Sequence, residues 1–164
     1  MDIDAALRWL QMTPVAKTIS ENEIIFPWIE SIHVLAIVIV VGSISIVDLR
    51  LLGVASLDRA VRRLMGDVLP LTWTAFAVAA VTGSLLFSSD AFNYGHNFFF
   101  RGKLILLCLA GLNMALFHAV GAEDIARWGA TRQTPPGAKA AGAASLVVWA
   151  AVVACGRLIG FTVR

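Results

Sequence analysis

Ionisable residues stand inside long apolar stretches of this sequence, where such residues are unusual. In residues 26–52, Glu30 and His33 lie near one end, and Asp48 and Arg50 lie near the other. At 100° per residue, Glu30, His33 and Asp48 fall on one face of a helix. Because a charged side chain is costly inside a bilayer, this stripe indicates a surface that faces other helices rather than lipid.

Depth along the helices sorts the unusual residues into two clusters. The outer cluster lies where the first and third apolar segments begin and contains Glu30, His33, Arg101, Lys103 and Arg157, with His96 in the connection beside it. The inner cluster lies at the other end and contains Asp48, Arg50, Asn113 and His118. In a square bundle the first and third helices are diagonal neighbours, so these residues would line a cofactor or cavity between them.

The histidines point first to haem b, which needs two imidazoles at one depth or one imidazole beside an open face. His33 and His118 are separated by roughly 15–25 Å of helix rise, so we expect them in separate sites. His96 can join His33 if its connection folds back over the bundle. The residues for the haem propionates would be Arg101, Lys103 and Arg157. The alternative is that each histidine is a neutral member of a hydrogen-bonded network.

Metal binding and ion pairing are further uses of the same residues. Glu30 and His33 share a helix face, as in carboxylate-bridged di-iron bundles, but the second and fourth segments offer no further carboxylate inside the membrane. A single Cu or Zn ion at the outer end, completed by water ligands, remains open, and the candidate metal ligands of the chain are His33 and His118. Without a cofactor, we expect Glu30 to pair with Lys103 or Arg157, and Asp48 to pair with His118 or Arg50.

The composition places the chain among membrane proteins. The 164 residues are 59% hydrophobic and 15% charged, and the mean hydropathy is +0.80. Soluble domains have about 45–50% apolar and about 25% charged residues. A net charge of +2 without a basic patch excludes a nucleic-acid partner. The two cysteines lie in separate apolar runs and predict free thiols.

Four apolar segments predict an all-α membrane protein. Each is about as long as the 20 residues that span a bilayer, and they cover residues 22–52, 68–88, 98–121 and 141–163. Short connections predict an up-down four-helix bundle over residues 1–164 as one domain. Residues 1–20 predict a short amphipathic helix at the membrane surface, ended near Pro14. Pro70 suits the first turn of the second segment.

Lysine and arginine predict the orientation. They are concentrated in the first and third connections, with Arg59, Arg62 and Arg63 in one and Arg127, Arg132 and Lys139 in the other. The positive-inside rule then places these connections in the cytoplasm and both termini in the periplasm.

Three stretches of the chain carry a resemblance to a known family. They are FPWIESIHVLAIVIVVGSISIVDLRLLG (26–53), VTGSLLF (81–87) and FRGKLILLCLAGLNMALFH (100–118). Nearly the whole chain resembles a family of small bacterial inner-membrane proteins known only as a domain of unknown function. The resemblance implies four transmembrane helices and a bacterial inner membrane, and it transfers no activity. It directs attention to His33, Asp48, Arg50, Lys103, Asn113 and His118.

These observations favour a membrane redox protein that binds haem b or acts on quinone inside the bundle. A small transporter or proton-coupled permease, with the two clusters at the ends of a path, is the alternative. A third reading is an accessory subunit without chemistry of its own. The expected partners are the lipid bilayer, a membrane redox protein or a second copy packed through Gly156-x-x-x-Gly160.

Overall fold

The computed structural model describes residues 3–128 and 134–163, and every regular element there is a helix. These helices are α1 (Ile3–Gln11), α2 (Pro14–Glu21), α3 (Ile25–Leu52), α4 (Val61–Ser89), α5 (Ala91–His96), α6 (Phe98–Trp128) and α7 (Pro136–Thr162). The helices α3, α4 and α7, and the part of α6 over Phe98–Ala119, are long and apolar enough to cross a membrane. The expected all-α architecture with four candidate spans is therefore confirmed.

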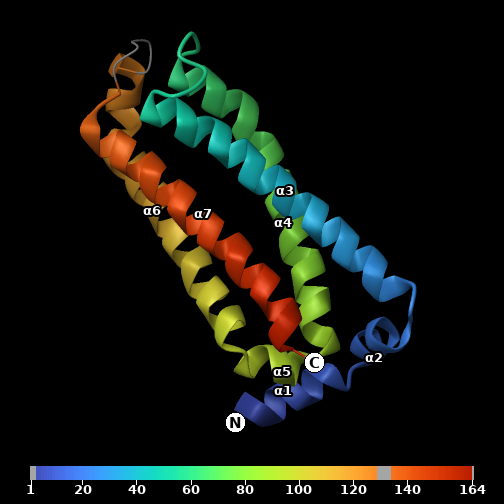
Figure 1. Ribbon diagram of the computed structural model, residues 1–164. Coiled ribbons are helices and arrows are strands. Elements are labelled where there is room, and N and C mark those ends of the chain that lie inside the picture. Colours follow the sequence, from blue (N-terminus) through green and yellow to red (C-terminus); the bar gives the residue numbers. More distant parts are fainter. Residues whose placement is uncertain (1–2, 129–133, 164) are drawn as a thin grey trace.

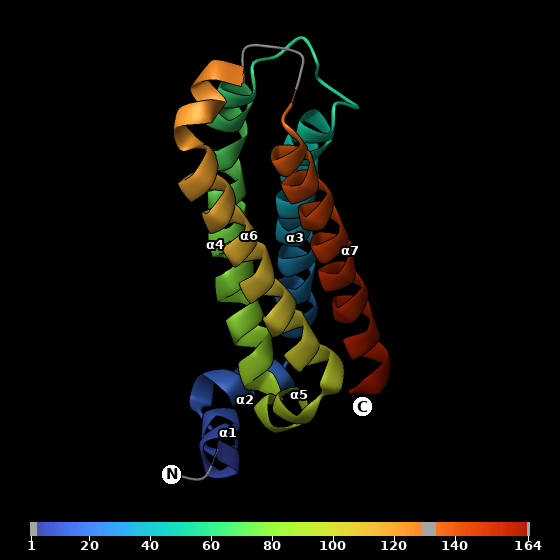
Figure 2. The same ribbon diagram turned by 90° about the vertical axis from the view of Figure 1, so that its left-hand side faces the viewer.

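The four long helices run side by side in alternating directions (Figures 1 and 2). The helix α3 packs along α4, α6 packs along α7, and α3 also packs along α7, whereas α4 meets α6 only sparsely. We call the end that carries α1, α2 and α5 the α5 end, and the opposite end the Arg50 end (Figure 1). Arg132, one of the residues used to predict orientation, lies outside the described residues.

The α4 helix begins seven residues before the predicted start, at Val61 instead of residue 68. Its first turns pack Val61 and Met65 against Leu51 of α3, and this apolar contact extends the helix beyond its most hydrophobic part. Pro70 therefore lies inside the helix and not in its first turn, so that prediction was wrong. Proline has no N–H to donate to the carbonyl of Gly66 one turn earlier.

The N-terminal segment forms two helices instead of one. Pro14, expected to end a helix, is the first residue of α2, and Thr13 caps that helix by accepting a hydrogen bond from the Ala16 N–H over 3.4 Å. Proline suits this position because the first amides of a helix have no intrahelical partner. Ala16 and Ile19 are buried, and α2 packs on α4. The two helices thus cover the α5 end (Figure 1).

The two remaining long helices also differ slightly from their predicted ranges. The α7 helix begins at Pro136 and not at residue 141, with Pro136 in its first turn. The α6 helix continues to Trp128, beyond the predicted end at residue 121. The connection expected before α6 contains the short helix α5.

Two glycines allow α3 to approach its neighbours closely. A Cβ atom at Gly83 of α4 would lie 2.9 Å from Cε1 of His33. A Cβ atom at Gly142 of α7 would lie 3.1 Å from the backbone oxygen of Asp48 and 3.2 Å from Cβ of Leu51. Each contact lies beside one of the polar clusters, so these glycines help to fix how α3 presents His33 and Asp48.

Candidate functional site

The two helices that carry His33 and His118 start at the same end of the bundle, but the two imidazoles lie at different depths. His33 is eight residues after the start of α3, and His118 is twenty residues after the start of α6. At 1.5 Å per residue these positions are about 12 Å and about 30 Å along their helices. The structure places His33 near the α5 end and His118 toward the Arg50 end, and it does not bring them together.

His33 packs against α4. Its Nδ1 lies 2.9 Å from the Thr82 hydroxyl oxygen, and its ring covers Gly83. The nearby Lys103 ammonium approaches α7 at Gly156, where an added Cβ atom would lie 4.0 Å from Nζ. Glu30 is exposed.

The outer residues do not form the expected ion pairs. Within the described residues, Glu30 forms an ion pair with neither Lys103 nor Arg157. The Arg157 guanidinium lies instead over the Phe161 ring, 4.8 Å from its centroid. Arg101 is exposed. The outer residues therefore form no ion-paired network within the described part of the chain.

His96 is turned toward the N-terminal segment and not toward His33. Its Nε2 lies 3.3 Å from an Asp4 carboxylate oxygen, and its Nδ1 lies 2.9 Å from the Phe92 carbonyl oxygen. Both contacts are on the exposed surface of the α5 end. The expected alternative of a His33–His96 pair is therefore not formed.

Tyr94 in α5 lies beneath the same surface and is half-buried. Burial raises the pKa of its phenol, and the nearby carboxylates of Asp90 and Glu30 raise it further. Because both effects oppose the phenolate, Tyr94 is a neutral hydrogen-bonding group at ordinary pH.

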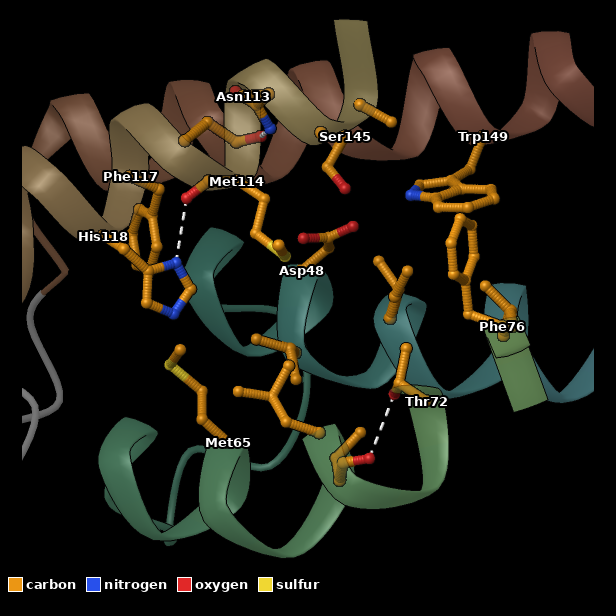
Figure 3. A pocket seen from close by; sticks show the side chains of 18 of the residues that line it. Asp48, Met65, Thr72, Phe76, Asn113, Met114, Phe117, His118, Ser145 and Trp149 are labelled. Carbon is orange, nitrogen blue, oxygen red and sulfur yellow. Dashed lines mark hydrogen bonds between the residues drawn. The ribbon is translucent and has the colours of Figure 1, made fainter. Parts of the chain in front are cut away.

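Three of the four inner residues, Asp48, Asn113 and His118, line a cavity of about 170 Å³ between the four long helices (Figure 3). Most of its lining is apolar and comes from all four helices. The polar and aromatic-polar side chains in the lining are Asp48, Thr72, Trp73, Asn113, His118, Ser145 and Trp149. The cavity is thus an apolar space with a small number of hydrogen-bonding groups, as is typical of small-molecule sites.

Asp48 is the most unusual of these groups. It is 5% exposed, and its Oδ2 has no hydrogen-bond partner within the described part of the chain. The Ser145 hydroxyl of α7 points toward this carboxyl group (Figure 3). Buried polar groups in folded proteins are nearly always satisfied, and ionisable residues inside spanning helices are functional candidates. An acid with an unsatisfied oxygen beside a cavity makes Asp48 the candidate ligand-binding residue.

His118 presents one ring nitrogen to the cavity. Its Nδ1 lies 2.8 Å from the backbone oxygen of Met114. A carbonyl oxygen only accepts hydrogen bonds, so Nδ1 carries the proton and Nε2 of the neutral ring has a free lone pair. In Figure 3 the Nε2 side of the ring faces Met65 of α4.

Arg50 and Asn113 hold the surrounding helices in place. Arg50 is buried, with Nε donating to the Arg59 carbonyl over 2.9 Å and Nη1 donating to the Thr134 hydroxyl over 3.5 Å. Asn113 donates from Nδ2 to the Ala141 carbonyl of α7 over 3.1 Å. The expected pairing of Asp48 with Arg50 or His118 is wrong, because Asp48 forms no ion pair with any described residue.

The sequence did not identify several residues that line this cavity. Ser145 and Thr72 have the common appearance of back-bonded helix residues, and Met65 lay in a predicted connection. Met114 has a visible signal, since it stands four residues before His118 and shares its helix face. Within residues 3–128 and 134–163, no group of three His, Cys, Asp or Glu side chains is placed to hold a metal ion.

Comparison with known proteins adds the family. No curated protein and no solved structure matches the chain. A family of unknown function, DUF6644, matches residues 6–162, which is nearly the whole length. The chain therefore belongs to the DUF6644 family.

Proposed function

We propose that this protein binds quinone or quinol in the cavity beside Asp48, as a membrane component of a redox system. The observation that carries the proposal is the buried Asp48 carboxyl group, whose Oδ2 has no hydrogen-bond partner among the described residues and which faces a largely apolar cavity. A ligand that hydrogen-bonds to this group would satisfy it. A quinone has such groups on an otherwise apolar ring.

The chemistry of Asp48 suits both redox forms of this ligand. A carboxylate accepts a hydrogen bond from a quinol hydroxyl, whereas a carboxylic acid donates one to a quinone carbonyl. The Ser145 hydroxyl beside it can do either. Aromatic side chains on the same cavity, Phe76 of α4 and Trp149 of α7, offer faces and edges to a flat ring (Figure 3).

The arrangement of the helices suits a ligand that arrives from the lipid. The α4 and α6 helices contact each other sparsely, and the lining between them consists of Leu69, Phe76, Leu107 and other apolar residues. An isoprenoid tail can lie there while the ring reaches Asp48. Pockets for drug-sized ligands occupy about 300–1,000 Å³, so a cavity of about 170 Å³ suits a single ring better than a porphyrin.

A titration with a short-chain benzoquinone tests the proposal. The protein is placed in lipid nanodiscs, and quenching of the tryptophan fluorescence reports binding beside Trp73 and Trp149, the two of the five tryptophans that line the cavity. We expect Asp48→Asn to weaken binding of the reduced form by about 10-fold or more, since a hydrogen bond to a charged group contributes about 1.5–3 kcal/mol. Glu30→Gln is the matched control, because it removes an exposed acid from the same helix and should bind as the wild type does.

Two results would overturn the proposal. One is saturable binding that Asp48→Asn leaves unchanged, or no saturable binding at all. The other is a Soret band in the purified protein that is lost in His118→Ala, which would replace quinone by haem b at this cavity. A quinone that co-purifies with the wild type and is absent from Asp48→Asn would support it.

A proton-coupled transporter is the second candidate, and the same buried acid favours it. Acidic residues inside membrane spans form proton relays in pumps and transporters. Proton flux into liposomes that is lost in Asp48→Asn, without any quinone binding by the wild type, would favour transport over the redox role.

A further inference from the structure

Two thioethers and one imidazole line the part of the cavity that lies away from Phe76 and Trp149. Met65 comes from α4, and Met114 and His118 come from consecutive turns of α6 (Figure 3). The chain has four methionines, so half of them line this one cavity. Thioethers and imidazole together form a neutral, soft set of donors.

We propose that Met65, Met114 and His118 bind a Cu(I) ion. This inference goes beyond quinone binding and uses a different part of the same cavity. Cu(I) is the physiological metal ion that thioether ligands select, whereas Mg²⁺ and Ca²⁺ require oxygen ligands. The proposal therefore names one metal and one oxidation state.

The hydrogen bond of His118 prepares it as a ligand. Its Nδ1 donates to the Met114 backbone oxygen over 2.8 Å, which leaves the lone pair of Nε2 for a metal. Histidine ligands usually have their second nitrogen held by such a carbonyl or carboxylate, because this fixes the tautomer and the ring orientation. In Figure 3 the Met65 side chain lies on the Nε2 side of this ring.

The charge of the site suits a monovalent cation. The three ligands are neutral, and the open Asp48 carboxyl group lines the same cavity. A Cu(I) ion beside an ionised Asp48 would give a net charge of zero in an apolar environment, where an uncompensated charge is costly. A divalent ion would leave one positive charge uncompensated.

The position of the site gives an ion a route to it. His118 lies toward the Arg50 end of α6, five residues before Glu123 in the sequence, and its side chain is exposed. Met114 is 36% exposed, whereas Met65 is buried. A metal can therefore approach from the membrane boundary through His118 and Met114 and reach Met65 last.

Competition against a colorimetric Cu(I) chelator tests the site in detergent under anaerobic, reducing conditions. The full-length chain carries Cys108→Ala and Cys155→Ala, so that free thiols do not bind the metal. We expect one Cu(I) per chain. Met65→Leu, Met114→Leu and His118→Gln should each weaken binding by about 10-fold or more, and each keeps a side chain of similar size. Met12→Leu and His96→Gln are the matched controls and should bind as the parent does.

The thermal midpoint provides a second measurement. Cu(I) should raise it in the parent chain and not in the Met65→Leu/His118→Gln double variant, whereas Zn²⁺ should raise it in neither. The proposal is overturned if the parent chain binds no Cu(I), or if the double variant binds Cu(I) as tightly as the parent. Quinone titrations with a metal chelator present test the proposed function separately, so either proposal can fail alone.

Discussion

Asp48 illustrates how residue type and surroundings together indicate a site. Its neighbours Arg50 and His118 were expected to neutralise it, yet Arg50 donates to the Arg59 carbonyl and His118 donates to the Met114 carbonyl. Asp48 stood out in the sequence because it is an acid in an apolar segment. Helical spacing did not predict that Arg50 and His118 would donate to backbone carbonyls instead of to Asp48.

The energetic position of Asp48 leads to a prediction about stability. The Asp48 Oδ2 atom has no partner among the described residues, and replacing an unsatisfied buried polar group by an apolar one of similar shape is neutral or favourable. We expect Asp48→Leu to leave the thermal midpoint unchanged or to raise the free energy of unfolding by about 1–3 kcal/mol, while quinone binding is lost. Thermal unfolding of the detergent-solubilised variant measures this. A clearly lower midpoint would show that the folded protein satisfies the acid, contrary to the geometry.

The cavity residues that the sequence did not identify were missed for a common reason. Met65 and Met114 are adaptable side chains that fill gaps in most apolar cores, so their presence alone carries little information. Ser145 becomes informative only through its position opposite Asp48 on another helix. The cavity is a property of side chains from four helices, and no single stretch of sequence contains it.

At the scale of the helices, the length of each apolar segment predicted that a spanning helix is present, but it did not predict the residues at which the helix begins and ends. Four long apolar segments predicted α3, α4, α6 and α7 because the need to span a bilayer leaves a strong pattern. The start of α4 was misplaced because Val61–Met65 is amphipathic and becomes helical by packing on α3. Tertiary contact extended the helix beyond the segment that the sequence marked.

The contact between α3 and α4 gives a prediction about packing. An added Cβ atom at Gly83 would lie 2.9 Å from the His33 ring, which Thr82 also holds by a hydrogen bond. We expect Gly83→Ala to lower the free energy of unfolding by about 1–3 kcal/mol, as overpacking usually does. Thermal unfolding measures the effect.

Two further variants separate this contact from a general effect of alanine. Gly42→Ala is the matched control, because nothing lies within 4 Å of a Cβ atom there. In a His33→Ala background, Gly83→Ala should lose its effect. If the loss of stability persists without the imidazole, the close approach of His33 is not its cause.

At the scale of the whole molecule, Arg50 connects the two helical hairpins. Its guanidinium reaches the connection after α3 through Arg59 and the residues before α7 through Thr134, and the side chain is 1% exposed. The sequence predicted an ion pair between Arg50 and Asp48. Arg50 instead donates to Arg59, nine residues away along the chain, and to Thr134, 84 residues away. Helical spacing does not predict contacts with two separate connections.

Removing the hydrogen bonds of Arg50 should loosen the packing at the Arg50 end. We expect Arg50→Met to lower the free energy of unfolding by about 1–3 kcal/mol, because the Arg59 carbonyl and the Thr134 hydroxyl lose the buried donor that holds them. Limited proteolysis should then cut residues 53–60 faster. Arg62→Met, which changes an exposed arginine near the same connection, should be cut as slowly as the wild type. Equal rates for all three proteins would contradict the role of Arg50.

Pro70 has a consequence for the cavity as a whole. The proline leaves the Gly66 carbonyl of α4 without its helical donor, and Leu69 and Thr72 on either side of the proline line the cavity. A helix bends most easily where a proline has removed one of its hydrogen bonds. The α4 wall contacts α6 only sparsely, so a bend of α4 at Pro70 would widen the cavity of about 170 Å³ and let it admit a larger ligand from the bilayer.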